Sequence, residues 1–333
     1  MRKIRIAQIG TSRYSHGHFI WNTFKKQSDL YEIVGYALPE NEREKFPEFM
    51  EDFDGYRELT VDEILNDPTI DAVAIETDEI YLTKYAQMVA EHKKHIHMEK
   101  PGSPNLRNFK KLIDTVKENN VVFHTGYMYR YNPYIKEIIQ KAKSGELGEI
   151  ISIEAQMNCI HPKEMREWLS CLPGGMMFYL GCHLVDLILQ IQGEPEKLIP
   201  MNKCSGVDGV SSKDFGMAVF EYKNGVSFAK ISAVEVGGYA RRQFVVSGTK
   251  GTIELKPFER IPGTEAREML YTGKTEYTEN SWDDNGSFSE SPVFDRYGDM
   301  MASFAAMARG EIKNPCTPDY ELKLFKYLLK ACK

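Results

Sequence analysis

Short apolar runs separated by amphipathic stretches fill the first 125 residues, and they constrain the fold more than any other feature of the sequence. Each run has the length and the continuous hydrophobicity of a strand that is buried on both faces. The runs are residues 4–9, 31–37, 71–75, 95–98 and 121–125. Helical stretches of roughly 10 to 15 residues stand between most of them, which predicts βαβ units and a doubly wound parallel sheet.

The second half of the chain has a different pattern, in which apolar and polar residues alternate as in strands with one exposed face. The alternating segments are residues 149–158, 215–220, 226–232, 242–246 and 251–255. Asn224-Gly225 joins two of them and is a strong hairpin signal. The polar stretch 260–292 is expected to be a surface excursion. We therefore expect an α/β domain at residues 1–125 and an α+β domain with an open, mostly antiparallel sheet at residues 126–333.

Composition excludes several classes of partner. The 333 residues carry a formal net charge of −6, whereas binding to duplex nucleic acid needs an excess of Lys and Arg. No apolar stretch reaches the ~20 residues of a membrane span, and the first strand begins without a signal-peptide pattern before it. The six cysteines have no CxxC or regular spacing, so we expect reduced thiols. These features predict a cytoplasmic protein that binds neither membranes nor nucleic acid.

The turn after the first strand has the position of a dinucleotide-binding turn. In such folds, glycines at this point let backbone N–H groups approach a pyrophosphate. Gly10 occupies the first glycine position, and the small residues Ser12 and Ser15 occupy the other two. An ordinary βα turn would fit the same residues. The acidic residue that is expected after the second strand to bind the ribose is replaced by Leu38, and Glu40 is its candidate substitute.

Lys100 follows the strand at residues 95–98, at the carboxyl edge where parallel sheets bind their ligands. A lysine that is partly desolvated beside a cofactor can have a lowered pKa and act as a general acid or base. A solvated lysine in a turn is the alternative. His92, His95 and His97 lie just before it, but no Cys or carboxylate is placed to complete a metal site with them, so we expect no metal.

The most apolar segment, residues 176–191, carries ionisable side chains in its middle. Tyr179, His183 and Asp186 stand at positions i, i+4 and i+7, which lie on one face of a helix. A phenol, an imidazole and a carboxylate in a column could relay a proton, with His183 as the acid or base. A buried His183 that is satisfied by Asp186 is the structural alternative.

Tyrosines surround Arg130 just after the proposed domain boundary. They are Tyr127, Tyr129, Tyr131 and Tyr134. Tyr and Arg side chains offer stacking surfaces and hydrogen bonds to hydroxyl groups, so this run could wall a polar substrate. Packing at a hinge between the domains explains the same residues equally well.

Taken together, these motifs resemble the glucose-fructose oxidoreductase, inositol dehydrogenase and MocA-type oxidoreductases (the Gfo/Idh/MocA family) over nearly the whole chain. The motifs that carry the resemblance are Gly10 to His18, Glu99-Lys100-Pro101, Gly126 to Pro133, Gly174-Gly175 with Gly181, His183 and Asp186, and Ser247 to Gly251. The resemblance implies an N-terminal Rossmann domain, a C-terminal α+β domain and NAD or NADP as the cofactor. It also implies a homodimer or homotetramer that forms through the C-terminal sheet.

The resemblance also assigns roles to single residues. Lys100 and His183 match the catalytic Lys and His of the family, and Tyr179 is a third catalytic candidate because it stands where the family usually has an Asp. The implied cofactor-binding residues are Gly10, Ser12, Arg13, Tyr14, Ser15, His18, Glu40, Thr77, Asp78, Glu99 and Lys100. The implied substrate-binding residues are Tyr127, Arg130, Trp168 and Asp186. The terminal His of the family's A-T-P-N-x-x-H stretch is Leu82 here.

We therefore expect an NAD(P)-dependent dehydrogenase or reductase that acts on CH–OH groups. It would transfer a hydride between nicotinamide and a small-molecule substrate, namely a sugar, a cyclitol or a related polyol derivative. Tyr179 favours one alternative, a redox-neutral NAD-using glycosidase or lyase of the same fold. The missing glycines and ribose-binding acid favour another, a non-catalytic ligand-sensing protein, but the presence of both Lys100 and His183 argues against it.

Overall fold

The chain divides into two compact units in the computed structural model, which describes residues 2–263 and 268–333. The N-terminal unit runs to Met128 and also includes Tyr297–Phe325. The C-terminal unit comprises Tyr129–Arg296 and Lys326–Lys333. The sequence placed a single boundary at residue 125 and assigned everything after it to the second domain. The structure instead returns residues 297–325 to the first unit.

The N-terminal unit is built on a five-stranded sheet in which every strand is parallel. Its strands are β1 (Ile4–Ile9), β2 (Tyr31–Ala37), β3 (Ala72–Ile75), β4 (His95–Met98) and β5 (Phe123–Thr125). Their order in the sheet is β2-β1-β3-β4-β5. The chain therefore reverses direction across the sheet between β1 and β3, and parallel sheets bind their ligands at the carboxyl ends of the strands on either side of such a point.

Helices connect these strands, as the amphipathic stretches predict. They are α1 (Gly17–Lys26), α2 (Glu42–Lys45), α3 (Val61–Asn66), α4 (Leu82–Glu91) and α5 (Leu106–Asn119). α2 is short: it ends at Lys45, and a 3₁₀ helix at Pro47–Phe53 follows it. Proline disfavours the α conformation in the residue before it, so Pro47 explains the break. Of the helices that the structure describes, none is long and apolar enough to span a membrane.

A returning segment completes the N-terminal unit with α9 (Gly298–Ala308) and the first half of α10 (Pro318–Ala331). The Tyr31 hydroxyl donates a hydrogen bond to the Met301 carbonyl at 2.5 Å. The rings of Phe109 and Phe325 stack with their centroids 4.1 Å apart. These contacts link residues about two hundred or more positions apart in the sequence, which explains why sequence periodicity alone assigned the segment to the wrong unit.

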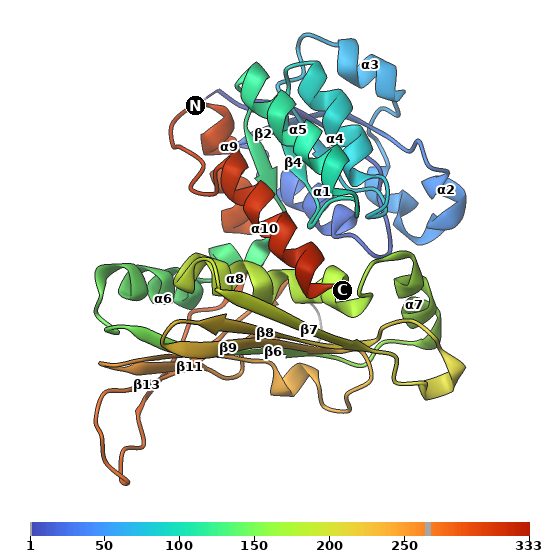
Figure 1. The fold of residues 1–333 in the computed structure, drawn as a ribbon. Helices are drawn as coiled ribbons and strands as arrows, with labels where there is room; N and C mark the ends of the chain where they lie inside the picture. The colour runs from blue at the N-terminus through green and yellow to red at the C-terminus, as the bar shows by residue number, and fades with distance from the viewer. Residues whose placement is uncertain (1, 264–267) are drawn as a thin grey trace. The chain divides into compact units, whose positions relative to one another are not determined.

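The C-terminal unit is built on an eight-stranded sheet in the order β14-β13-β11-β10-β6-β9-β8-β7. The strands are β6 (Ile150–Asn158), β7 (Lys197–Lys203), β8 (Phe215–Tyr222), β9 (Gly225–Ser232), β10 (Gln243–Gly248), β11 (Thr252–Leu255), β13 (Gly273–Tyr277) and β14 (Ser287–Glu290). β6 and β9 pair in parallel and the other neighbours are antiparallel, so the sheet is mostly antiparallel as predicted. Figure 1 shows α6 (Pro133–Ser144) and α8 (Cys182–Gln192) on one face of this sheet.

The polar stretch 260–292 contains strands and is not only the surface excursion that the sequence predicted. β13 and β14 extend the large sheet, and β12 (Met269–Leu270) pairs with β15 (Phe294–Asp295). Residues 264–267 of the stretch lie outside the described residues. The strands escaped detection because their exposed faces are polar and β13 forms its ladder with β11, a partner that a single-sequence pattern does not reveal.

The expected helix at residues 176–191 begins differently from a regular α-helix. Met177–Gly181 forms a single π-helical turn, and α8 continues from Cys182. A π turn holds more residues than an α turn, so the side chains before and after it no longer keep the α-helical spacing. Such turns are rare and occur frequently at functional sites.

The Gly10 position gives the first testable prediction. Gly10 has φ +81°, and an added Cβ would come within 2.8 Å of the Thr77 Cα and backbone nitrogen. We expect Gly10→Ala to lower the free energy of unfolding by about 3 kcal/mol, because backbone strain and a backbone clash add together. Denaturant unfolding of the purified variant measures the loss.

Gly55 is the matched control, because it has the same φ of +81° but no atom within 4 Å of the added Cβ. Gly55→Ala should cost only about 1 kcal/mol, the strain of the left-handed conformation alone. Equal losses at the two positions would show that the approach to Thr77 contributes nothing.

Candidate active site

The first βα turn lies against the end of β3 in the N-terminal unit. Gly10 closes β1, and its N–H donates to the Ala37 carbonyl at 2.7 Å. Thr77 follows β3 and fills the space beside Gly10, so no side chain fits there. Thr11 is fully buried, and within the described residues its hydroxyl oxygen has no hydrogen-bond partner. The turn therefore has the tight backbone of a dinucleotide-binding turn.

Two serines stand where a dinucleotide-binding turn has glycines, and the structure shows what their hydroxyl groups do. Ser12 donates to the Asp78 carboxylate and accepts the Tyr14 N–H at 3.1 Å. Ser15 donates to the Glu76 carbonyl at 2.9 Å and accepts the Gly17 N–H at 3.1 Å. Both side chains thus fasten the turn to the segment after β3, which glycines could not do.

Lys100 lies in a buried chain of charged groups. Its side chain is only 1% exposed, and its ammonium nitrogen lies 3.2 Å from Glu99 Oε1. The other Glu99 oxygen lies 2.9 Å from His16 Nδ1, just before α1. Burial alone would raise the pKa of Glu99, but His16 and Lys100 outweigh burial and hold that pKa well below its usual range. The predicted half-desolvated lysine is therefore a buried one with a carboxylate beside it.

Two further carboxyl groups are buried near this chain. Glu76 and Glu79 are each 0% exposed, and no described residue donates a hydrogen bond to their four carboxyl oxygens. Burial raises the pKa of Glu79 to about 8. Burial and the nearby Glu99 charge raise the pKa of Glu76 well above its usual range. Burial thus favours the protonated form of both groups, because a buried carboxylate is costly to keep ionised.

The histidines near Lys100 do not form a metal site in the described part of the chain. No group of three or more His, Cys, Asp or Glu residues there could hold a metal ion. His97 Nδ1 lies 2.8 Å from His124 Nδ1, and burial lowers the pKa of His97 to about 4. His92 instead lies within 2.8 Å of the Met88 carbonyl on its own helix.

Several other predicted cofactor-binding residues have partners elsewhere in the N-terminal unit. Arg13 donates to Glu48 at 2.7 Å, and Tyr14 packs edge-on against Phe46. His18 stacks on Phe49 with ring centroids 4.8 Å apart. Glu40 accepts hydrogen bonds from Tyr85 at 2.5 Å and from Lys84 at 2.9 Å. A ribose that used Glu40 would have to compete with these two donors.

His183 lies on α8 in the C-terminal unit beside a buried ionic cluster. Its ring meets Tyr129 edge to face, with centroids 4.8 Å apart. The Tyr129 hydroxyl donates to Glu259 at 2.8 Å, and Glu259 also accepts from Arg242 and Arg296. The two guanidinium groups outweigh burial and lower the pKa of Glu259. The cluster fixes the Tyr129 ring, and Tyr129 in turn fixes one side of His183.

Asp186 is held by Arg130 in the same unit. Arg130 donates to both carboxylate oxygens at 2.8 Å, and Gln190 adds a third hydrogen bond at 3.0 Å. The Asp186 side chain is 1% exposed and that of Arg130 is 7% exposed. The structure thus brings together two of the predicted substrate-binding residues, but as a bidentate pair whose hydrogen bonds hold α8 to the segment before α6.

Tyr179 lies in the π-helical turn with aromatic neighbours. Its ring meets Trp168 edge to face at 5.4 Å between centroids, and it meets His161 at 6.4 Å. Burial lowers the pKa of His161 to about 4, so this imidazole is neutral at physiological pH. Tyr127, the remaining predicted substrate-binding residue, is 2% exposed and belongs to the N-terminal unit.

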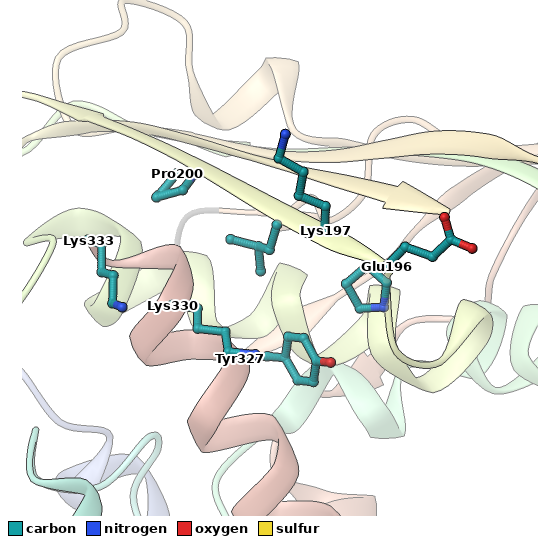
Figure 2. Close-up of a pocket in the computed structure, with 8 residues that line it drawn as sticks. Glu196, Lys197, Pro200, Tyr327, Lys330 and Lys333 are labelled. Atoms are coloured by element: carbon teal, nitrogen blue, oxygen red, sulfur yellow. The ribbon is translucent and has the colours of Figure 1, made fainter. Parts of the chain in front are cut away.

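The chain also has a pocket of about 360 Å³ that the sequence did not predict (Figure 2). It lies in the C-terminal unit between β7 and the end of α10. Its lining residues are Pro195, Glu196, Lys197, Leu198, Pro200, Tyr327, Lys330 and Lys333. No predicted site residue lines it, and Figure 2 shows the Lys197 side chain directed away from α10, so the pocket adds nothing to the candidate site.

Sequence reasoning missed the residues that act through tertiary neighbours. His16, Glu76 and Glu79 were not selected, although the acidic run after the apolar strand at 71–75 was a usable signal. A carboxylate directly after a buried strand is costly unless it is paired or used. His16 and His161 had no such signal, since their partners Glu99 and Tyr179 are distant in the sequence.

Two sequence models of one oxidoreductase family match the chain. The model described as "Oxidoreductase family, NAD-binding Rossmann fold" matches residues 4–127. The model described as "GFO/IDH/MocA C-terminal domain" matches residues 134–254. The two matched segments together make up most of the chain.

Known proteins give the same relationship. An uncharacterised oxidoreductase of Rhizobium meliloti is 27% identical over 216 residues, which are 64% of this chain and 63% of that relative. Myo-inositol 2-dehydrogenase of Thermotoga maritima is 26% identical over 198 residues, which are 57% of this chain and 58% of that enzyme. The chain thus matches less than two thirds of either relative. A solved oxidoreductase structure from Thermotoga maritima has a TM-score of 0.76 at 20% identity, over 100% of this chain and 96% of its own.

The buried carboxyl groups predict a specific pH dependence of stability. The pKa of Glu79 rises from 4.5 to about 8 on folding, so the folded chain binds more protons between these values and loses stability as the pH rises through them. Glu79→Gln removes that loss. Relative to the wild type, the variant should gain about 4 kcal/mol of unfolding free energy between about pH 5 and pH 9. Denaturant unfolding across this range measures it.

Glu118→Gln serves as the control, because Glu118 is an exposed carboxylate on α5 of the same unit. Its unfolding free energy should follow that of the wild type at every pH. A Glu79→Gln curve parallel to the wild-type curve would contradict the assignment of a bound proton to Glu79.

Proposed function

The chain belongs to the Gfo/Idh/MocA family of oxidoreductases, whose N-terminal domain is an NAD-binding Rossmann fold, and on that premise we propose that it is a dehydrogenase or reductase acting on a CH–OH group. The substrate class that we propose is a sugar, a cyclitol or a related polyol derivative. Myo-inositol 2-dehydrogenase, one of its relatives, supports this class. The alignment spans 58% of that enzyme, so its substrate is not transferred to this chain, and the substrate class is our proposal.

One observation carries the proposal: a buried lysine at the carboxyl end of β4, in the same unit as a turn that fits a dinucleotide. Gly10 lets the backbone turn closely, and the buried Thr11 hydroxyl oxygen is available for a hydrogen bond within the described chain. The backbone of residues 10–15 would hold the pyrophosphate, as such turns do at a helix N-terminus. The bound cofactor would supply the hydride chemistry at its nicotinamide ring.

The protein's own residues would move the proton. Loss of a hydride from a carbinol carbon leaves a hydroxyl proton that a side chain must accept, and we assign this role to Lys100 and His183. Tyr129 fixes the His183 ring from one side, and Glu99 fixes the Lys100 ammonium. We assign Tyr179 and Trp168 to the binding of the substrate, since adjacent aromatic rings offer faces for C–H groups and a phenol for a hydroxyl.

Lys100→Met tests the catalytic assignment. Methionine keeps the length of the side chain but cannot carry a proton, so we expect turnover to fall by at least about a thousandfold. Nicotinamide absorbance, followed with a panel of polyols and with both NAD and NADP, measures turnover. A thermal-shift assay measures cofactor binding, which should survive because a ligand that binds the folded state raises the apparent stability.

Lys110→Met is the matched control, since Lys110 is exposed on α5 and pairs with Asp114 in its own helix. Its turnover should equal that of the wild type. Wild-type turnover in Lys100→Met would remove the lysine from the mechanism. Conversion of a glycosidic substrate by the wild type without net production of reduced cofactor would favour the redox-neutral reaction. We consider that reaction because Tyr179 stands where the family usually has an Asp.

We also propose that two copies of the chain pair through the exposed face of the C-terminal sheet. The face opposite α8 carries a continuous apolar row across neighbouring strands, from Ile199 on β7 to Val219 on β8 and Phe228 on β9. Met201 and Met217 form a second row beside it. These side chains are exposed or only half-buried. A contiguous apolar patch of this kind is typical of a protein interface.

Val219→Lys should break this pairing, because it places a charge in the middle of the apolar row. Light scattering coupled to size-exclusion chromatography should report an oligomer for the wild type and a monomer for the variant. Val293→Lys is the control, since Val293 is exposed outside the sheet strands. A wild-type monomer, or an oligomer that survives Val219→Lys, would contradict the interface.

A further inference from the structure

A buried lysine that accepts protons needs a route by which those protons leave. Lys100 is 1% exposed, so water does not reach its ammonium group freely. Glu76 and Glu79 also lie near it, but both are fully buried and therefore lead to no solvent. An acceptor with one side in water is needed if Lys100 is to be reset after each turnover.

The structure provides such an acceptor through Glu99. Glu99 is 1% exposed and places one oxygen 3.2 Å from Lys100 Nζ and the other 2.9 Å from His16 Nδ1. The His16 side chain is 19% exposed. The His16 backbone N–H also faces Glu99 Oε2, at 3.4 Å, and its ring packs against Tyr297 with centroids 5.5 Å apart. A buried lysine and a half-buried imidazole are thus joined by a single carboxylate that both of them hold in place.

We propose that Lys100, Glu99 and His16 form a proton path from the active-site lysine to solvent. His16 is its outer member and acts as a positioning residue that exchanges the proton with water. The inference rests on the proposed dehydrogenase function and deepens it, because it assigns the fate of the hydroxyl proton.

The proton balance of the path is complete. The carbinol carbon of the substrate would give a hydride to the bound cofactor, and the substrate hydroxyl group gives its proton to the neutral amine of Lys100. Lys100 passes one proton to Glu99, Glu99 passes one to His16 Nδ1, and His16 releases one from Nε2 to water. The net products are a carbonyl group, a reduced cofactor and one proton in solvent. Reduction of a carbonyl group runs the same path inward.

The charged groups around the path disfavour retention of the proton on Glu99. Glu99 feels the charges of His16 and Lys100, which hold its pKa well below the usual range, so it does not retain a proton. His97 lies on β4, which ends just before Glu99. Burial lowers the pKa of His97 to about 4, so its imidazole remains neutral. Burial raises the pKa values of Glu76, Glu79 and Asp78, but none of the three has a contact with Glu99 or His16 that would place it on the path among the described residues.

The first test uses the protein without cofactor or substrate, so it does not depend on activity. Proton-path members must respond to one another's charge. In NMR spectra recorded at one fixed neutral pH, the His16 ring signals should change position when Glu99→Gln removes the carboxylate that contacts Nδ1. The signals of His92, which is bound only to its own helix, should not move in the same variant. An unmoved His16 signal would overturn the path whatever the enzyme does.

The second test is kinetic. His16→Gln should lower kcat by about a hundredfold near neutral pH, the lower range of what a proton-transfer group contributes. Imidazole added to the assay should restore the rate, because a small free base can replace the lost proton acceptor. His92→Gln, the control, should keep the wild-type rate. Thermal denaturation and thermal shift with the dinucleotide should remain at wild-type values in both variants.

The outcomes separate the path from the proposed function. A wild type that turns over no polyol contradicts the dehydrogenase assignment, and the NMR response still decides the coupling of His16. A wild-type rate in His16→Gln overturns the path. So does a lost rate that imidazole does not restore, because that result would give His16 a purely structural role.

Discussion

The contact between the first βα turn and the end of β3 is the constraint on which the N-terminal unit depends. β1 and β3 lie side by side although more than sixty residues separate them, and Gly10 meets the Thr77 backbone where both strands end. Ser12 and Ser15 then fasten the turn to Asp78 and Glu76. Two serines in glycine positions are therefore compatible with the turn. Their hydroxyl groups stabilise it through hydrogen bonds to the segment after β3, across the point where the strand order reverses.

Charge at this edge is the second constraint. Three fully buried carboxyl groups, Glu76, Glu79 and Glu99, surround one lysine. Burial raises the pKa values of Glu76 and Glu79 and so favours their protonated forms, whereas His16 and Lys100 lower the pKa of Glu99 and favour its carboxylate.

The C-terminal unit holds its candidate residues by ion pairs within an apolar helix. Arg130 neutralises Asp186, and Arg242 with Arg296 neutralises Glu259, which orients Tyr129 against His183. A buried charge persists only when such partners satisfy it. His183 and Asp186 are therefore each held by a residue from another element: Tyr129 packs against His183, and Arg130 binds Asp186. The π turn at Met177–Gly181 gives Tyr179 its own surroundings beside Trp168.

The sequence by itself determined the parallel sheet, five strands of the second sheet (β6 and β8 to β11, but not β7), the Gly10 turn and the position of Lys100, because hydrophobic period and turn residues are local signals. Only the tertiary structure decided that residues 297–325 return to the first unit, that Arg130 binds Asp186, and that His16 meets Glu99. It also decided that burial raises the pKa values of Glu76 and Glu79. These outcomes depend on contacts between distant segments and on the solvent that folding removes, and no local pattern of residues encodes either of them.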